Sequence, residues 1–132
     1  MTTAPEDYWA VARDPAVREH VSGIPPSGSD ELRAAVILAG EDTADGRGWL
    51  YIRRILVALG MATQEQADED DDDDEEYAKA WRDVDDVLHG LMRYGSYCTW
   101  DRCGYRMTDK WHQMAADIEG LAMHVGGTVD GC

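Results

Sequence analysis

Nine acidic residues follow one another without a break, and this run is the most distinctive chemical feature of the chain. They are Asp68, Glu69, Asp70, Asp71, Asp72, Asp73, Asp74, Glu75 and Glu76. Nine like charges repel one another and bury no apolar surface, which favours a solvated loop. Carboxylates are stabilised at the N-terminus of a helix by its dipole, so the end of the run suits a helix start. We therefore expect residues 68–76 to form an internal loop or a helix extension.

The density of negative charge predicts binding to cations on another protein. Duplex DNA carries one charge per roughly 1.7 Å of axis. A helix rises about 1.5 Å per residue and an extended chain about 3.3 Å, so an acidic stretch in either state approaches that density. The segment that follows the run adds Asp83 and Asp86, which lie off its apolar stripe. Both are included with the run as candidate partner-binding residues.

A second group of residues has the chemistry of a zinc site. His89, Cys98, Cys103 and His112 are all able to ligate zinc, and the two histidines flank the cysteine pair symmetrically. The intervening spacings of eight, four and eight residues are not those of a standard zinc finger. We therefore expect free thiols at Cys98 and Cys103 and no cofactor, with a disulfide or a bound zinc ion as alternatives.

The acids at the end of the run, Glu75 and Glu76, are also candidate ligands for magnesium. All-helical nucleotide pyrophosphohydrolases hold Mg²⁺ through Glu-Glu-x-x-Glu on one helix and Glu-x-x-Asp on the next. Here Glu75-Glu76-x-x-Lys79 places a lysine where the third glutamate belongs. The pair Asp83 and Asp86 begins seven residues after Glu76, which leaves no room for a second helix. The sequence therefore does not carry that motif, and we expect no enzyme.

Composition limits the choice of partner and location. The 132 residues suit a single acidic domain spanning 1–132, with a modest core. Removing the nine charges of the run from the net charge of −15 leaves −6. This sign argues against direct binding to nucleic acid or to an anionic membrane, and it favours a basic protein. No secretory signal pattern and no apolar run of membrane-spanning length is visible, so a cytoplasmic location is expected.

The spacing of apolar residues predicts the elements that carry these groups. Steps of three and four predict two long helices, 77–92 and 111–125. Residues 95–105 between them suit a long connection or a small hairpin, so we expect an antiparallel helical hairpin. A further helix is expected over 30–39, ended by Gly40. The apolar stretch 49–59 favours a buried helix, with a strand as the alternative.

These elements predict an all-α fold, a small bundle of four to six helices. The expected core is Trp9, Leu32, Val36, Trp49, Ile52, Leu56, Leu59, Trp81, Val84, Leu88, Leu91, Met114, Ile118 and Leu121.

The functional expectation is a non-catalytic binding or inhibitor protein that masks a basic surface. One setting is a nucleic-acid mimic acting against a nuclease or another enzyme that handles DNA or RNA. An immunity protein or antitoxin for a cationic toxin is the alternative. A zinc-stabilised domain or a magnesium-dependent helical nucleotide hydrolase is the second alternative.

Overall fold

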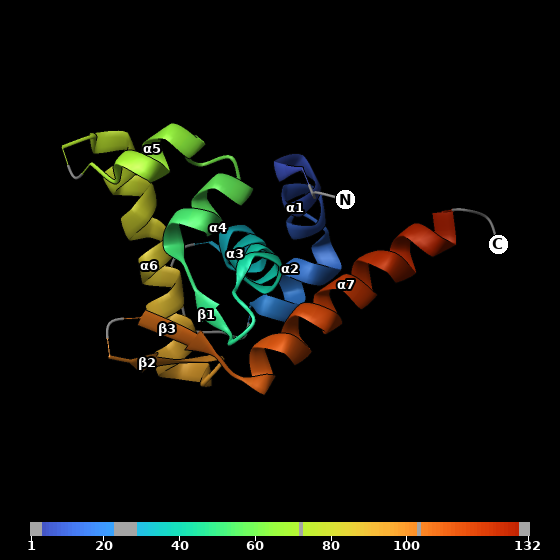
Figure 1. Ribbon diagram of the computed structural model, residues 1–132. Coiled ribbons are helices and arrows are strands. Elements are labelled where there is room, and N and C mark those ends of the chain that lie inside the picture. The colour runs from blue at the N-terminus through green and yellow to red at the C-terminus, as the bar shows by residue number, and fades with distance from the viewer. Residues whose placement is uncertain (1–3, 23–28, 72, 103, 130–132) are drawn as a thin grey trace.

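The computed structural model describes residues 4–22, 29–71, 73–102 and 104–129, with side chains as far as residue 122. These parts of the chain form helices and three short strands (Figure 1). In chain order the elements are α1 (Pro5–Ala12), α2 (Pro15–Val21), α3 (Asp30–Thr43), β1 (Trp49–Leu50), α4 (Ile52–Ala58), α5 (Gln64–Glu69), α6 (Glu75–Gly95), β2 (Cys98–Asp101), β3 (Gly104–Met107) and α7 (Asp109–Val129). The protein is mostly helical, and the expectation of a purely all-α fold is wrong at the small sheet.

The sheet is antiparallel, in the order β1-β3-β2. Strands β2 and β3 form the small hairpin that was one of the two expectations for the connection, and Trp100 lies opposite Tyr105 in it. On the other side of β3, Leu50 also pairs with Tyr105. The stretch 49–59 is therefore a short strand followed by a helix, because β3 offers its first residues a backbone partner. A pattern of apolar residues alone does not reveal such a distant partner.

Helix α3 lies at the centre of the molecule in Figure 1 and packs against α1, α2, α4, α6 and α7. Ser29 caps its N-terminus by accepting a hydrogen bond from the Leu32 amide at 3.1 Å. Gly40 does not end this helix as predicted, since the helix continues to Thr43. A Cβ atom at Gly40 would lie 2.5 Å from Cζ2 of Trp111. The glycine therefore serves the close approach of α7 to α3.

Helices α6 and α7 are the two longest described, with 21 residues each, as the apolar spacing predicts. They do not pack against each other as an antiparallel hairpin. Helix α6 packs on α4 and β2, while α7 packs on α3 and α2. The indole of Trp111 donates to the carbonyl of Ile37 at 3.1 Å, which fixes α7 on α3. The β2–β3 hairpin, which joins the two long helices in the chain, packs on α6 through β2 and on α7 through β3.

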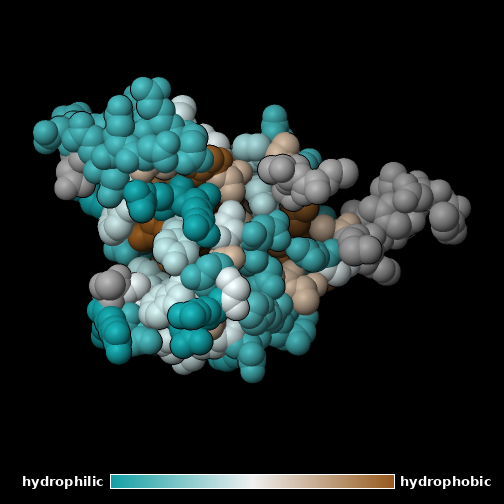
Figure 2. Space-filling view, viewed as in Figure 1, coloured by the Kyte–Doolittle hydropathy of each residue, from teal (hydrophilic) through white to brown (hydrophobic). Residues whose placement is uncertain are grey.

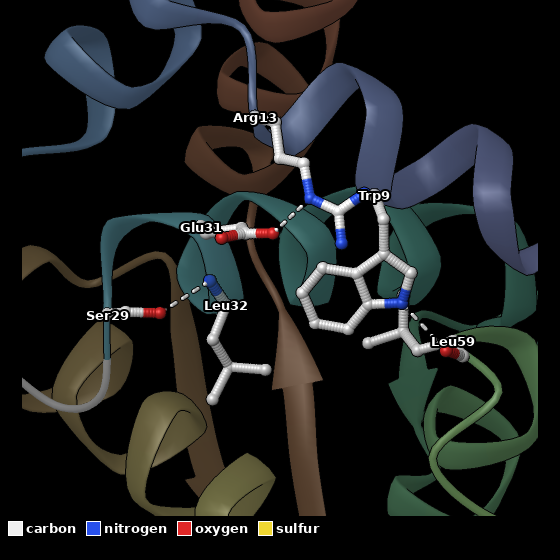
Figure 3. A network of polar contacts seen from close by, with 6 residues as sticks. All are labelled: Trp9, Arg13, Ser29, Glu31, Leu32 and Leu59. Atoms are coloured by element: carbon white, nitrogen blue, oxygen red, sulfur yellow. Dashed lines mark hydrogen bonds and ion pairs between the residues drawn. The ribbon is translucent and has the colours of Figure 1, made fainter.

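Figure 3 shows two of the polar contacts that join α1 and the residue after it to the rest of the scaffold. The Trp9 indole donates to the carbonyl of Leu59 at 2.8 Å, just after the end of α4. Nε of Arg13 lies 2.7 Å from Oε1 of Glu31 on α3. The first bond joins α1 to the end of α4, and the second joins the residue after α1 to the first turn of α3. Helix α5 itself packs on α4.

Burial confirms most of the predicted core. Eight of its residues are buried: Val36, Leu56, Leu59, Val84, Leu88, Leu91, Met114 and Ile118. Five more are partly buried against it: Trp9, Leu32, Ile52, Trp81 and Leu121. Trp49 is also only partly buried, and the guanidinium of Arg106 lies 5.8 Å from its ring centroid. The core extends further than predicted, to Tyr8, Ile37, Ile55, Tyr105 and other residues of the same cluster.

Candidate functional site: an acidic turn beside an aromatic cleft

The acidic run is divided among a helix end, a turn and a helix start. Asp68 and Glu69 are the last residues of α5, and Glu75 and Glu76 are the first of α6. Between them Asp70, Asp71, Asp73 and Asp74 make the connection, while Asp72 lies outside the described residues. We call the described residues of 68–76 the acidic turn. Figure 2 shows a hydrophilic surface over α5 and the beginning of α6 at the upper left.

A closed set of hydrogen bonds holds the acidic turn. Gln66 donates from its side chain to Oδ2 of Asp74 at 3.1 Å, and its carbonyl accepts from the amide of Asp70 at 2.9 Å. The hydroxyl of buried Tyr77 donates to Oδ1 of Asp70 at 2.7 Å, and its amide donates to Oδ1 of Asp74 at 3.1 Å. These four bonds form a closed loop that runs from Gln66 through Asp70, Tyr77 and Asp74 back to Gln66. It fixes Asp70 in the left-handed region, with φ 48°.

Each donor in this set is neutral. The amide of Tyr77 and the side chain of Gln66 hold the pKa of Asp74 below its ordinary value, against the opposing effect of desolvation. No described carboxylate of the acidic turn forms an ion pair with another described residue. The scaffold positions the Asp70 and Asp74 carboxylates without neutralising them. Their carboxylates therefore remain available to cations from outside the chain.

The two acids predicted beyond the run differ from each other. Asp83 accepts from Nζ of Lys79 at 3.0 Å, one helical turn away, so its charge is already compensated. Asp86 is exposed on α6. Lys79 is also the residue that departs from the magnesium motif. Its ammonium group pairs with Asp83, whereas the motif needs carboxylates that are free to hold a metal ion.

The four residues considered for zinc have separate surroundings where they are described. His89 is exposed on α6, and one ring nitrogen of His112 lies 2.8 Å from both carboxylate oxygens of Glu41. Cys98 is a free thiol in the core, where burial raises its pKa to about 12. Cys103 lies outside the described residues. Within the described chain, no three His, Cys, Asp or Glu side chains gather as metal ligands.

A cleft of about 350 Å³ opens beside the acidic turn, between the start of α4, α6 and the β2–β3 hairpin. Side chains of both polar and aromatic character line it: Arg53, Asp70, Trp81, Asp85, Trp100 and Tyr105. Asp70 also lines a shallow depression with Glu69, Asp71 and Asp73. The cleft and the acidic turn therefore meet at Asp70 and form one continuous candidate site.

Local pairing in the hairpin builds the wall of the cleft. Trp100 and Tyr105 are cross-strand partners, and their rings meet edge to face with centroids 5.0 Å apart. The Tyr105 hydroxyl donates to Oδ1 of Asp85 on α6 at 2.9 Å. Desolvation, reinforced by this bond, raises the pKa of Tyr105. Asp85 was not among the predicted site residues, because its role depends on a tyrosine twenty residues away.

Comparison of the chain with models of known protein families, with curated proteins and with solved structures found no match. Among the helices of the described residues, none combines the length and the apolar character that crossing a membrane would require.

Proposed function

We propose that this protein is a non-catalytic acidic binding protein that masks a basic surface of another protein. The observation that carries the proposal is the acidic turn: neutral donors hold its Asp70 and Asp74 carboxylates, and none of its described carboxylates has an ion-pair partner among the described residues. A solubilising tail needs charge but no fixed geometry. An array that is held in place suits a partner whose cations are also held in place.

The partner belongs to the class of proteins whose own function uses a cationic surface, such as a nucleic-acid-handling enzyme or a cationic toxin. Exposed charge pairs each contribute at most about 1 kcal/mol and are screened by salt. Several pairs acting together accelerate association more than they slow dissociation. The complex should therefore form quickly at low ionic strength and weaken steeply as salt is added.

The test changes the charge of the turn and preserves its geometry. The variant carries Asp71→Asn and Asp73→Asn, because an asparagine at position 71 keeps the oxygen that accepts from the Asp73 amide at 2.9 Å. The control carries Glu6→Gln and Glu19→Gln on α1 and α2, which lie apart from the acidic turn in Figure 1. Each variant therefore loses two negative charges, at different places on the protein.

The native protein first captures its partner from a lysate at low salt, and mass spectrometry identifies it. The dissociation constant of the purified pair is then measured as a function of salt. The proposal expects the turn variant to bind more weakly and with a flatter salt dependence than the control. Equal behaviour of the two variants would reduce the acidic turn to a connection. An added DNA duplex that competes with the protein for the partner would favour the nucleic-acid-mimic setting.

A further inference from the structure

The cleft beside the acidic turn presents aromatic surface that the core does not use. Trp100 is 54% exposed, whereas Trp111 is fully buried. Trp81, the second indole of the cleft, is partly buried against the core. A large ring this exposed beside carboxylates is typical of a recognition site, because indoles bind cations through the faces of their rings.

The carboxylate of Asp85, which lines the same cleft, is held by a hydrogen bond but is not neutralised. One oxygen of Asp85 accepts from Tyr105, and the other has no hydrogen-bond partner in the described part of the chain. Arg53 is the one cation lining the cleft in that same part, and it donates to the carbonyl of Ala67 at 3.4 Å. It forms no ion pair there with Asp70 or Asp85. The two carboxylates therefore leave the lining with an excess negative charge.

We propose that this cleft receives an arginine side chain of the basic partner, with its guanidinium stacked on Trp100 and hydrogen-bonded to Asp85. The inference rests on the proposed function and names the chemistry that this surface selects. A guanidinium is planar, is weakly hydrated and stacks on aromatic rings, whereas an ammonium is a compact, strongly hydrated charge. Because Asp70 borders both the cleft and the acidic turn, a basic segment lying on the turn brings a further side chain to the cleft. The turn supplies attraction, and the cleft supplies an anchor that prefers arginine to lysine.

The test compares two blocked peptides of equal charge, hexa-arginine and hexa-lysine, at low ionic strength. The native protein should bind hexa-arginine more tightly, and Trp100→Ala should reduce this preference by about 3- to 10-fold. Tyr94→Ala is the matched control, since Tyr94 is 57% exposed but does not line the cleft. The control should keep the full preference. Asp85→Asn, which keeps an acceptor for Tyr105, should weaken the binding of hexa-arginine more than that of hexa-lysine.

Nuclear magnetic resonance of the unmodified protein locates the peptide without any substitution. The indole signal of Trp100 should shift on addition of hexa-arginine, while that of Trp111 should not. An equal preference in the Trp100 and Tyr94 variants, or an unmoved Trp100 signal, would overturn the inference. The variant Asp71→Asn with Asp73→Asn separates this result from the proposed function, because it should weaken both peptides by the same factor. If it changes neither affinity while Trp100→Ala still removes the preference, the proposed function fails and the arginine site stands.

Discussion

Tyr77→Phe is the most direct test of how the acidic turn is held. The substitution removes one oxygen atom and keeps a ring that is only 2% exposed. The lost bond is short, 2.7 Å, and its acceptor is the carboxylate of Asp70. Hydrogen bonds to charged groups contribute about 1.5–3 kcal/mol. Asp70 is exposed, so water replaces part of that interaction, and the phenyl ring leaves no buried donor unsatisfied. We therefore expect a loss of about 1 kcal/mol in the free energy of unfolding.

The assay is urea unfolding, followed by tryptophan fluorescence, for both single variants and the double variant of Tyr77→Phe and Asp70→Ala. The double-mutant cycle should give a coupling energy of about 1 kcal/mol, because each single change already removes the shared bond. Amide exchange at Asp70 and Asp73 should also accelerate in Tyr77→Phe, since the turn loses one of its hydrogen bonds to α6. A coupling energy below about 0.3 kcal/mol, within the usual deviation from additivity, would refute this account of the turn.

Three further changes test other parts of the structure. Gly40→Ala should destabilise the fold by roughly 1–3 kcal/mol through overpacking against Trp111, whereas Gly120→Ala, with open space around it, should stabilise α7 by up to about 1 kcal/mol; thermal unfolding compares the two. Cys98 should not react with a thiol reagent at neutral pH until the protein unfolds, because burial raises its pKa to about 12. The pKa of Asp74 is lowered on folding, so its stabilising contribution should be present above the ordinary aspartate pKa and lost as the pH falls through the lowered value. Unfolding curves at several pH values should show that loss for the native protein and not for Asp74→Ala.

Local pattern predicted the helices better than their arrangement. The stripes along α6 and α7 repeat at three and four residues, so the sequence alone locates both helices and most of their buried side chains. The spacing does not show which other helix each apolar face packs against. Trp111 fits α3 only because Gly40 leaves room for its ring, and a glycine near a helix end resembles a stop signal. The short strand β1 was predicted only as an alternative to a helix for a similar reason, since its backbone partner is β3, more than fifty residues later.

Part of the candidate site is visible as a local sequence pattern, and part depends on contacts between residues far apart in the chain. The acidic turn is visible in the sequence as a run of charge, and the helix dipole correctly indicates that its last residues begin α6. Its fixed geometry is not visible there, because it depends on the side chains of Gln66 and Tyr77, which lie outside or at the edge of the run. The cleft needs Trp100 and Asp85 brought together by the hairpin. The sequence left the segment that forms this hairpin open between a long connection and a small hairpin.

The hydrogen bonds that hold the acidic turn determine how a bound partner changes the stability of the fold. Neutral donors fix the Asp70 and Asp74 carboxylates but do not cancel the mutual repulsion of the acids in the turn, so the free protein retains electrostatic strain at this site. A partner that supplies cations removes the repulsion and binds only the folded turn. By linkage, such a partner stabilises the fold in proportion to its concentration relative to its dissociation constant. If the run were only a loose solubilising segment, cations would neutralise it equally well in the unfolded chain and would confer no such stability. Hexa-lysine should therefore raise the melting temperature of the native protein more than that of the variant with Asp71→Asn and Asp73→Asn.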